Sequence, residues 1–256
     1  MDILCSKTDG ILSIEFNRPE RKNAITAAMY QTMADALGDA EQDEAVRAIL
    51  IAGKPEIFTA GNDLDDFLKN GGAAEGGERP VFQFMRRLSE AGKPVVAAVA
   101  GAAVGIGTTL LMHCDLVYAA DNAKFSMPFV QLGLCPEFAS SLLFTQLAGY
   151  PRAAEKLMLG EAFTAQEALD MGLLAKVLPL DELRPFALRQ AARLVALPAA
   201  SIRATKQLMK QSRAEPVKAA MAAENQLFGA MLDRPEAKEA FTAFFEKRKP
   251  DFSKFS

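Results

Sequence analysis

Five short segments of the chain have the length and the apolar pattern of β-strands. They are residues 11–16, 46–52, 94–100, 115–120 and 175–178. The third is apolar throughout, which is typical of a strand that is covered on both faces of its sheet. Between the first two, Thr26 predicts the start of a helix that reaches about Asp43 and carries apolar side chains along one face. This alternation of strands and helices predicts an α/β fold.

Helical patterns dominate the second half of the chain. Thr164 and Glu167 have the spacing of a capping box, which predicts a helix start at Thr164. Residues 181–249 show only helical periodicity, with breaks expected at Pro198, Pro216 and Pro235. We therefore expect an α/β core over residues 1–197 and a C-terminal helical region over residues 198–256.

The composition indicates a globular protein without a surface for nucleic acid. The 256 residues are 50% hydrophobic and 24% charged, which suits one large domain or a domain with an appendage. The formal charge is −3, whereas proteins that bind nucleic acid usually show a basic excess. The single histidine excludes a His-rich metal site within one chain. Three widely separated cysteines argue against a disulfide framework.

No targeting or membrane-spanning segment is expected. The first predicted strand begins at Ile11, which leaves no room for a signal peptide. The most apolar stretch, residues 95–111, is interrupted by glycines at positions 101, 105 and 107. The chain does not end in the peroxisomal signal Ser-Lys-Leu. We therefore expect a cytoplasmic protein that has no membrane partner.

The first candidate for chemistry is the turn within residues 58–64, Phe-Thr-Ala-Gly-Asn-Asp-Leu. Gly61 permits a sharp turn after a strand, and Asp63 is placed to cap the helix that follows. We expect the turn to leave the backbone N–H of Ala60 without a partner, so that it could bind an oxyanion. The alternative is an ordinary turn between a strand and a helix.

The second candidate, residues 98–110, leads from a buried strand through a glycine-rich loop into a helix. The N–H groups of the first helical turn, including that of Ile106, would point at the loop. Gly105 and Gly107 begin a dinucleotide-binding pattern, but Leu110 stands where its third glycine belongs. The helix is also too short for a βαβ crossover. A nucleotide site is therefore not favoured.

The third candidate is Glu137, which lies between Pro136 and Phe138 just before an apolar helix. A carboxylate in a first helical turn has an ordinary structural explanation, because the helix dipole favours it there. The functional alternative is a general base whose pKa is raised by its apolar surroundings. His113, in an apolar run, and Cys135, with no histidine beside it, are expected to be structural.

Taken together, these segments resemble the enoyl-CoA hydratase/isomerase (crotonase) family over nearly the whole chain. The resemblance rests on the order and spacing of several short motifs. They are Phe16-Asn-Arg-Pro19 with Asn23-Ala24, Ala60-Gly-Asn-Asp-Leu64, Lys93-Pro-Val-Val-Ala-Ala-Val99, residues 101–107, Cys114-Asp115, Leu132-Gly133 and Phe244-Phe-Glu-Lys-Arg248.

The resemblance implies a crotonase-like spiral of ββα units with a C-terminal α-helical trimerisation region, in a homotrimer or a hexamer of two trimers. It implies an acyl-CoA thioester as substrate, with no metal and no cofactor besides the coenzyme A of the substrate. The N–H groups of Ala60 and Ile106 would hold the thioester oxygen. The other residues implied to meet the substrate are Gly61, Asn62, Asp63, Leu64 and Phe129, with Phe244 and Lys247 from the closing helix of a neighbouring subunit.

Two departures from the family pattern indicate the reaction. Thr109 and Phe129 replace the two glutamates that manage water in hydratases of the family, and neither side chain exchanges a proton near neutral pH. Glu137 falls where isomerases that move a double bond from position 3 to position 2 carry their single acid and base. The segments 62–64 and 136–141 resemble the peroxisomal-type branch of these enzymes. We therefore expect an isomerase that converts 3-enoyl-CoA to trans-2-enoyl-CoA in the degradation of unsaturated fatty acids.

Other activities stay open on the sequence alone. A different crotonase-type reaction, such as weak hydration or hydrolysis, would use the same two N–H donors with other side chains. A non-catalytic relative that binds acyl-CoA or RNA would show no turnover. Acyl chain length depends on how the pocket is shaped by Phe82, Phe84, Phe129 and residues 69–80, a predicted mobile loop rich in Gly and Ala.

Overall fold

The computed structural model describes residues 1–66 and 78–255. Within these residues, one sheet has six strands and a second has four. The larger contains, in spatial order, β1 (Ile3–Thr8), β2 (Ile11–Phe16), β3 (Ala48–Ala52), β5 (Val95–Val99), β7 (Leu116–Ala120) and β10 (Lys176–Leu178). The smaller contains β4 (Ile57–Thr59), β6 (Ala102–Val104), β8 (Lys124–Ser126) and β9 (Phe163–Thr164).

From β3 to β8, successive strands alternate between the two sheets. β3, β5 and β7 are parallel neighbours in the larger sheet, while β4, β6 and β8 are parallel neighbours in the smaller one. Each pair of strands is followed by helical structure before the next pair begins. The chain therefore winds as a spiral of ββα units, which confirms the predicted fold class.

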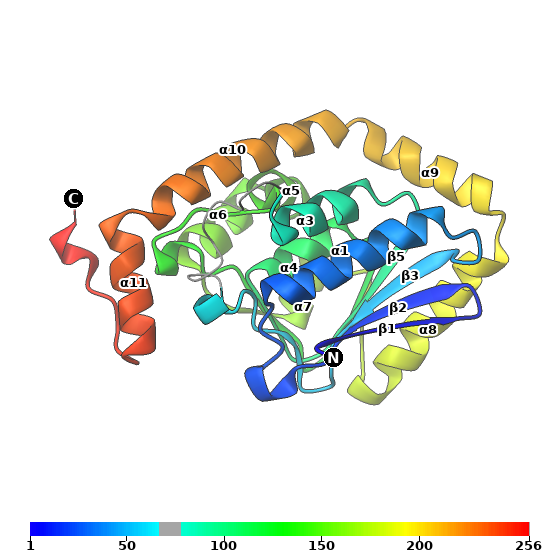
Figure 1. Ribbon diagram of the computed structural model, residues 1–256, viewed down its shortest axis with the longest axis horizontal. Helices are drawn as coiled ribbons and strands as arrows, with labels where there is room; N and C mark the ends of the chain where they lie inside the picture. The colour runs from blue at the N-terminus through cyan, green and yellow to red at the C-terminus, as the bar shows by residue number, and fades with distance from the viewer. Residues whose placement is uncertain (67–77, 256) are drawn as a thin grey trace.

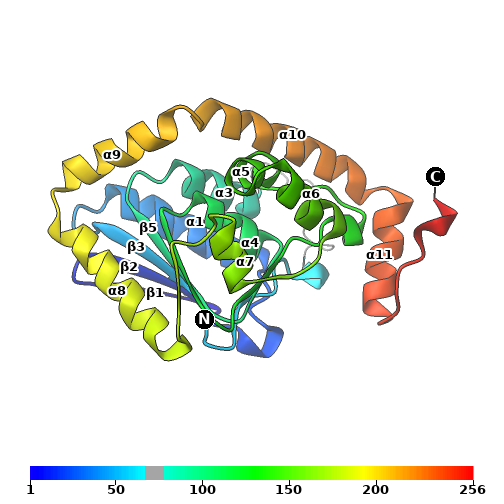
Figure 2. The ribbon, with the colours of Figure 1, turned by 180° about the vertical axis from the view of Figure 1, so that it is seen from behind.

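Helices cover both faces of the larger sheet (Figures 1 and 2). One set of alternate side chains in β3 and β5 packs with α1 (Ala27–Gln42) and α3 (Pro80–Glu90). The other set packs with α8 (Leu180–Ala196). Because neighbouring side chains of a strand point to opposite faces, burial on both sides requires a continuous apolar run. This explains the uninterrupted Val and Ala sequence of β5.

Two helix starts follow from local sequence as predicted. Thr26 caps α1, because its hydroxyl accepts a hydrogen bond from the N–H of Met29 at 3.3 Å. Thr164 begins α7 (Ala165–Asp170) with both hydrogen bonds of a capping box, made with Glu167. The remaining helices before α8 are η1 (Pro19–Arg21), α4 (Ile106–Thr109), η2 (Leu110–His113), η3 (Val130–Leu132), α5 (Ser140–Ala148) and α6 (Tyr150–Leu159).

The C-terminal helices form an arc over one side of the molecule (Figure 1). They are α9 (Ala199–Gln211), α10 (Ala214–Leu232) and α11 (Pro235–Phe245), with η4 (Phe252–Lys254) after them. Breaks at Pro198 and Pro235 are confirmed. The break predicted at Pro216 is wrong: it falls at residues 212–213, and Pro216 lies in the first turn of α10, where a missing N–H costs little. Within the described ranges, no helix combines the length and apolar character that a membrane crossing needs.

The sequence missed several short strands and also β1, which has six residues but is exposed at all except the first, so it shows no apolar alternation. The segment predicted as a glycine-rich loop contains β6, and β1 and β8 had no counterpart among the predicted strands. Strands of three residues are too short to show an alternating pattern, and β6 forms because it pairs with β4 and β8. The loop predicted over residues 69–80 lies mostly outside the described residues, and Pro80 begins α3.

Candidate active site

Two turns of the chain meet at the carboxyl ends of strands in the smaller sheet. The first turn follows β4, and the second follows β6. β4 and β6 are parallel, so their carboxyl ends lie side by side. Gly61, after β4, has a φ of +85°, and a side chain there would come within 2.7 Å of the carbonyl oxygen of Val104. Gly107, after β6, packs equally closely against the side chain of Thr59. Glycine at these two positions therefore lets the turns touch.

The expectation that Ala60 has an unpaired N–H is wrong. This group donates to the carbonyl oxygen of Lys22 at 3.0 Å, because residues 22–25 run beside the turn. The N–H groups on either side of Asn62 are also bonded, to Thr59 Oγ1 at 3.1 Å and to the carbonyl oxygen of Ile25 at 2.9 Å. The N–H of Asn62 itself has no partner among residues 1–66 and 78–255. The turn thus offers one backbone donor, two residues later than expected.

The second turn offers a donor where the sequence placed it. Ile106 is the first residue of α4, and its N–H has no partner in the described part of the chain. The preceding N–H, of Gly105, donates to the carbonyl oxygen of Ser126 at 2.9 Å. The touching turns therefore each carry one unpaired N–H, the kind of pair that can stabilise a developing oxyanion.

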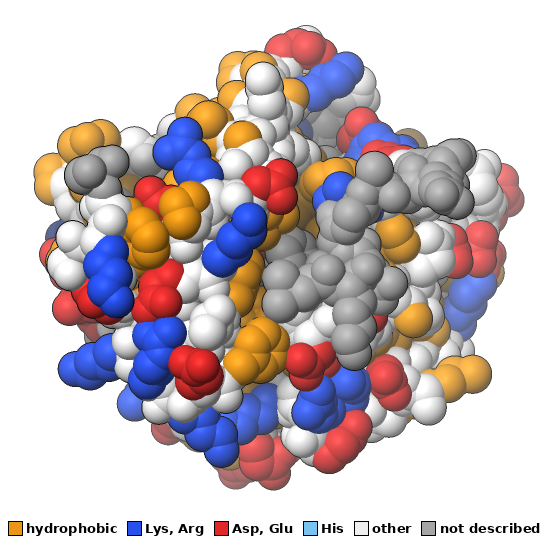
Figure 3. Space-filling view, turned by 60° about the vertical axis from the view of Figure 1, so that its left-hand side comes forward, with side chains coloured by type: hydrophobic (Ala, Val, Ile, Leu, Met, Phe, Trp, Pro, Cys, Tyr) orange, Lys and Arg blue, Asp and Glu red, His pale blue; other side chains and the backbone are white. Residues whose placement is uncertain are grey.

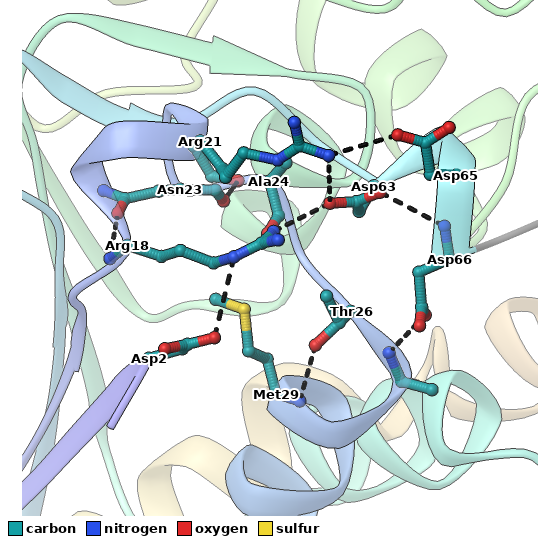
Figure 4. A network of polar contacts seen from close by, with 12 residues as sticks. Asp2, Arg18, Arg21, Asn23, Ala24, Thr26, Met29, Asp63, Asp65 and Asp66 are labelled. Atoms are coloured by element: carbon teal, nitrogen blue, oxygen red, sulfur yellow. Dashed lines mark hydrogen bonds and ion pairs between the residues drawn. The ribbon is translucent and has the colours of Figure 1, made fainter.

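An ion-pair network holds the first turn in place (Figure 4). Arg18 Nη1 donates to Asp63 Oδ2 at 2.7 Å and to the carbonyl oxygen of Ala24 at 2.9 Å, and Arg21 lies 4.0 Å from the same carboxylate. The other oxygen, Oδ1, accepts from the N–H of Asp66 at 3.2 Å, which confirms Asp63 as a helix cap. Burial raises the pKa of Asp63, but the bonds from Arg18 and Asp66 outweigh it and lower this pKa below its usual value. Both oxygens of Asp63 are used inside the protein, so its side chain positions the turn.

The carboxyl group of Glu137 is buried and incompletely bonded. The residue is 5% exposed, and Oε1 has no hydrogen-bond partner within the described residues. Burial, and next the charge of Glu224, raise the pKa of Glu137 to about 8. Helix α5 begins only at Ser140, so Glu137 does not lie in a first helical turn and the dipole explanation is wrong. A buried carboxyl with a raised pKa is typical of a general acid or base.

The turn after Glu137 has an unusual backbone. Phe138 and Ala139 both have a positive φ, of 61° and 55°, which non-glycine residues rarely adopt. His113 supports this turn: Nε2 lies 2.8 Å from the carbonyl oxygen of Phe138, and the two rings stack at 3.9 Å. Burial lowers the pKa of His113 to about 3, so it is neutral. This contact agrees with the structural role predicted for His113.

Tyr30 joins α1 to the first turn, a contact that the sequence did not indicate. Its hydroxyl donates to Asn62 Oδ1. Burial, and then the charge of Glu137, raise the pKa of Tyr30 well above its usual value. The ring of Phe84 packs against both Tyr30 and Phe138, at 5.6 and 6.3 Å between centroids. In the sequence, Tyr30 looks like any other apolar position on the buried face of α1.

Thr109 and Phe129 stand near the second turn. Thr109, at the end of α4, is fully buried and its hydroxyl has no hydrogen-bond partner in the described chain. Phe129 is buried too, and its ring would lie 3.9 Å from a side-chain carbon added to Gly105. A hydroxyl group and an aromatic ring therefore stand near the second turn, where the resemblance would place the two glutamates of a hydratase.

Phe244 and Lys247, the residues expected to contact coenzyme A, lie in the last turn of α11 and just after this helix. Phe244 is 57% exposed, and Lys247 follows the end of the helix with a φ of +55°. Leu64, by contrast, begins the helix after Asp63 and packs against the main core. From the side of α11 the surface is hollowed beside the residues drawn in grey, with apolar side chains in the hollow (Figure 3). Contact of Phe244 and Lys247 with a neighbour's ligand stays a prediction.

The described residues contain no group of three or more His, Cys, Asp or Glu side chains that could hold a metal ion. Cys5, Cys114 and Cys135 are free thiols, as their spacing predicted. The described candidates for chemistry are the two unpaired backbone N–H groups of the turns and the carboxyl group of Glu137.

Comparison with known proteins supports the resemblance seen in the sequence. The family model described as enoyl-CoA hydratase/isomerase matches residues 6–254. The crystal structure of an enoyl-CoA hydratase/isomerase from Pseudoalteromonas atlantica superposes with a TM-score of 0.94 at 39% identity, covering 99% of this chain and 100% of that one. The 2,3-dehydroadipyl-CoA hydratase of Escherichia coli is 32% identical, covering 98% of both chains. The enoyl-CoA delta isomerase 2 of Rattus norvegicus is 38% identical over 85% of this chain and 56% of that protein.

Proposed function

This chain belongs to the enoyl-CoA hydratase/isomerase family, and we propose that within it the protein isomerises 3-enoyl-CoA to trans-2-enoyl-CoA. Its relatives include proteins named as hydratases and proteins named as isomerases. The choice between the two reactions therefore depends on the site. The observation that carries the proposal is the buried carboxyl group of Glu137, whose Oε1 has no hydrogen-bond partner among the described residues.

The thioester oxygen is held by the N–H groups of Asn62 and Ile106. Removal of the C2 proton turns this oxygen into an enolate, and donors already in place stabilise the new charge. One such donor typically lowers the barrier by about 2.7–4 kcal/mol. Asn62 replaces Ala60 in this role, because the N–H of Ala60 is already bonded to Lys22.

Glu137 carries the proton. Its carboxylate takes the proton from C2, which gives a dienolate, and returns it to C4, which leaves the double bond between C2 and C3. One carboxyl group suffices, because it is base in the first step and acid in the second. A pKa of about 8 suits both steps, since proton transfer is most efficient when the pKa lies near the working pH.

Hydration would need a group that activates water, and Thr109 and Phe129 offer none. Another buried carboxyl group, on Glu224, bonds to the turn that follows Glu137. However, its oxygens accept three hydrogen bonds from Ala139 and Ser141, so they are engaged within the protein. The ring of Phe129 also helps to keep water from the dienolate.

The proposal is tested by comparing two substrates of equal chain length. With 3-enoyl-CoA we expect the conjugated thioester, seen as a rise in near-ultraviolet absorbance, because Glu137 can move the proton. With 2-enoyl-CoA we expect little or no 3-hydroxyacyl-CoA. In heavy water the product should gain deuterium at C4, unless Glu137 returns the same proton before it exchanges. A hydration rate equal to or above the isomerisation rate would overturn the assignment, and a hydratase of the family serves as the positive control.

The pH dependence of the reaction should report the ionisation of Glu137. Only the ionised carboxyl accepts a proton, so we expect kcat/KM to rise about tenfold per pH unit below the pKa and to level off above it. The profile should level off near pH 8, because burial and the charge of Glu224 raise the pKa of Glu137 to about 8. Initial rates in a series of buffers at constant ionic strength measure it. A profile that is flat down to about pH 6 would contradict the raised pKa.

The arc of C-terminal helices supports the expected trimer or dimer of trimers. Several large apolar side chains on α9 and α10 are exposed in the single chain. They are Leu208 at 70%, Met209 at 69% and Leu227 at 58% exposure. Contact with other copies of this chain would remove their apolar surface from water.

A further inference from the structure

Another buried carboxyl group, absent from the sequence-based candidates, bonds to the turn that follows Glu137. Glu224 on α10 is 6% exposed, and its closest bonds are with the turn that follows Glu137. We propose that Glu224 is a positioning residue: from α10 it holds the turn that presents Glu137, and it brings a second carboxyl group to that turn. This inference rests on the proposed function, in which Glu137 moves the proton.

The bonds from Glu224 fix the backbone on both sides of Ser140. Oε2 accepts from the N–H of Ala139 at 2.5 Å. Oε1 accepts from the N–H of Ser141 at 2.9 Å and from its hydroxyl at 2.5 Å. One carboxylate thus receives three hydrogen bonds from a segment 83–85 residues earlier in the chain.

This segment cannot provide these bonds for itself. Helices usually begin with Ser, Thr, Asp or Asn, whose side chain accepts the first free N–H groups. Here Ala139 precedes α5, in a left-handed conformation and with no side-chain acceptor of its own. Glu224 supplies the missing acceptor from another helix. Without it, the two left-handed residues after Glu137 would keep the support of His113 but lose the acceptor for the N–H of Ala139.

Glu224 is also the charged group that acts on Glu137. Among the described residues, the titratable groups facing Glu137 are Tyr30 from α1, Cys135 from the preceding loop and Glu224 from α10. His113 supports the turn from η2 and is neutral. Burial raises the pKa of Tyr30 and of Cys135, so both are uncharged near neutral pH.

The two carboxyl groups are not equivalent. Burial raises the pKa of Glu224 as well, and its three hydrogen bonds from Ala139 and Ser141 offset part of this rise. Glu137 has no donor at Oε1, so it is the member of the pair that takes up a proton. When two buried carboxyl groups interact, ionisation of one raises the proton affinity of the other.

The test compares Glu224→Gln with the wild type over a range of pH. The amide still accepts from Ser141 but carries no charge and cannot accept from Ala139. We expect kcat to fall at least about tenfold, because the turn that presents Glu137 loses a hydrogen bond. The acid limb of the kcat/KM profile, which is the part that rises with pH, should move about one pH unit lower, because the negative charge near Glu137 is gone. A difference infrared titration of the Glu137 carboxyl band, identified by its loss in Glu137→Gln, should move in the same direction without depending on turnover.

Two further variants separate positioning from general damage. Glu215→Gln removes a carboxylate from an exposed position on the same helix and should leave both kcat and the pH profile unchanged. Glu224→Asp keeps the charge but withdraws it by one methylene, so kcat should fall while the acid limb moves less than in Glu224→Gln. If Glu224→Gln does not fold, as judged by circular dichroism, Glu224→Asp decides the matter, and an unchanged kcat would overturn the proposal.

Failure of this inference can be told apart from failure of the proposed function. If the wild type isomerises 3-enoyl-CoA and Glu137→Gln does not, but the folded Glu224→Gln protein keeps the wild-type acid limb, then Glu224 has no influence on the base. If the wild type shows no isomerisation, the proposed function fails, and the infrared titration still tests whether Glu224 acts on Glu137.

Discussion

Glu137→Gln is expected to lower kcat for isomerisation at least about a hundredfold. General acid and base catalysis by a positioned side chain typically contributes about 10²–10⁴-fold, and the amide cannot accept the C2 proton. Gln has nearly the same size as Glu, so the buried site keeps its packing. Binding of the acyl-CoA should change little, because the thioester oxygen is held by backbone groups of other residues. Steady-state rates with 3-enoyl-CoA and the Kd of a non-reactive acyl-CoA measure the two effects.

Cys135→Ser serves as the matched control for this substitution. It lies two residues from Glu137 and changes a half-buried polar side chain in the same loop. It should keep kcat within a few-fold of the wild type, because no step uses the thiol. If a folded Glu137→Gln protein turned over at nearly the normal rate, Glu137 would have no part in the mechanism.

Ile106→Pro should lower kcat by about 10²–10³-fold, the usual cost of losing one oxyanion donor. Ile106 is the first residue of α4, where proline fits a helix best because the N–H has no partner within the helix. The substitution therefore deletes the N–H with little change to the backbone. KM should change less than kcat, since the donor bonds most strongly to the enolate.

The side chain of Ile106 is fully buried, so its loss needs a separate control. Ile106→Ala removes more of the side chain than proline does but keeps the N–H. It should lower the melting temperature and leave kcat within a few-fold of the wild type, because the cavity affects stability rather than the donor. Equal losses of kcat in the two variants would mean that packing, and not the N–H, matters at this position.

Features of the fold that depend on neighbours in the chain were predictable from the sequence. The strand Ile11–Phe16, the cap at Thr26 and the capping box at Thr164 all appear where the pattern placed them. Hydrophobic periodicity and caps act over a few residues, so one sequence contains all the information they need. The family motifs also predicted how distant segments are arranged, because their order along the chain is the one that the family's spiral fold requires.

Glu137 and Ile106 were also recognisable as candidates, since each lies in a motif with a defined local shape. Which backbone N–H is unpaired in the first turn could not be predicted in the same way. Ala60 is bonded because residues 22–25 lie beside it, so the donor becomes Asn62. The sequence of the turn contains no sign of this pairing, which joins segments nearly forty residues apart.

The surroundings of the base were decided by tertiary structure alone. Tyr30 reaches Asn62 from α1, and Glu224 reaches Ala139 from α10, across separations of 32 and 85 residues. In the sequence both look like ordinary members of amphipathic helices. A hydrogen bond or a charge acts through space over a few ångströms, whereas a sequence pattern records only neighbours along the chain. The sequence by itself therefore determined the family and the spiral and indicated Glu137 as the candidate base, and the folded chain decided which groups hold Glu137 and which N–H groups of the two turns stay unpaired among the described residues.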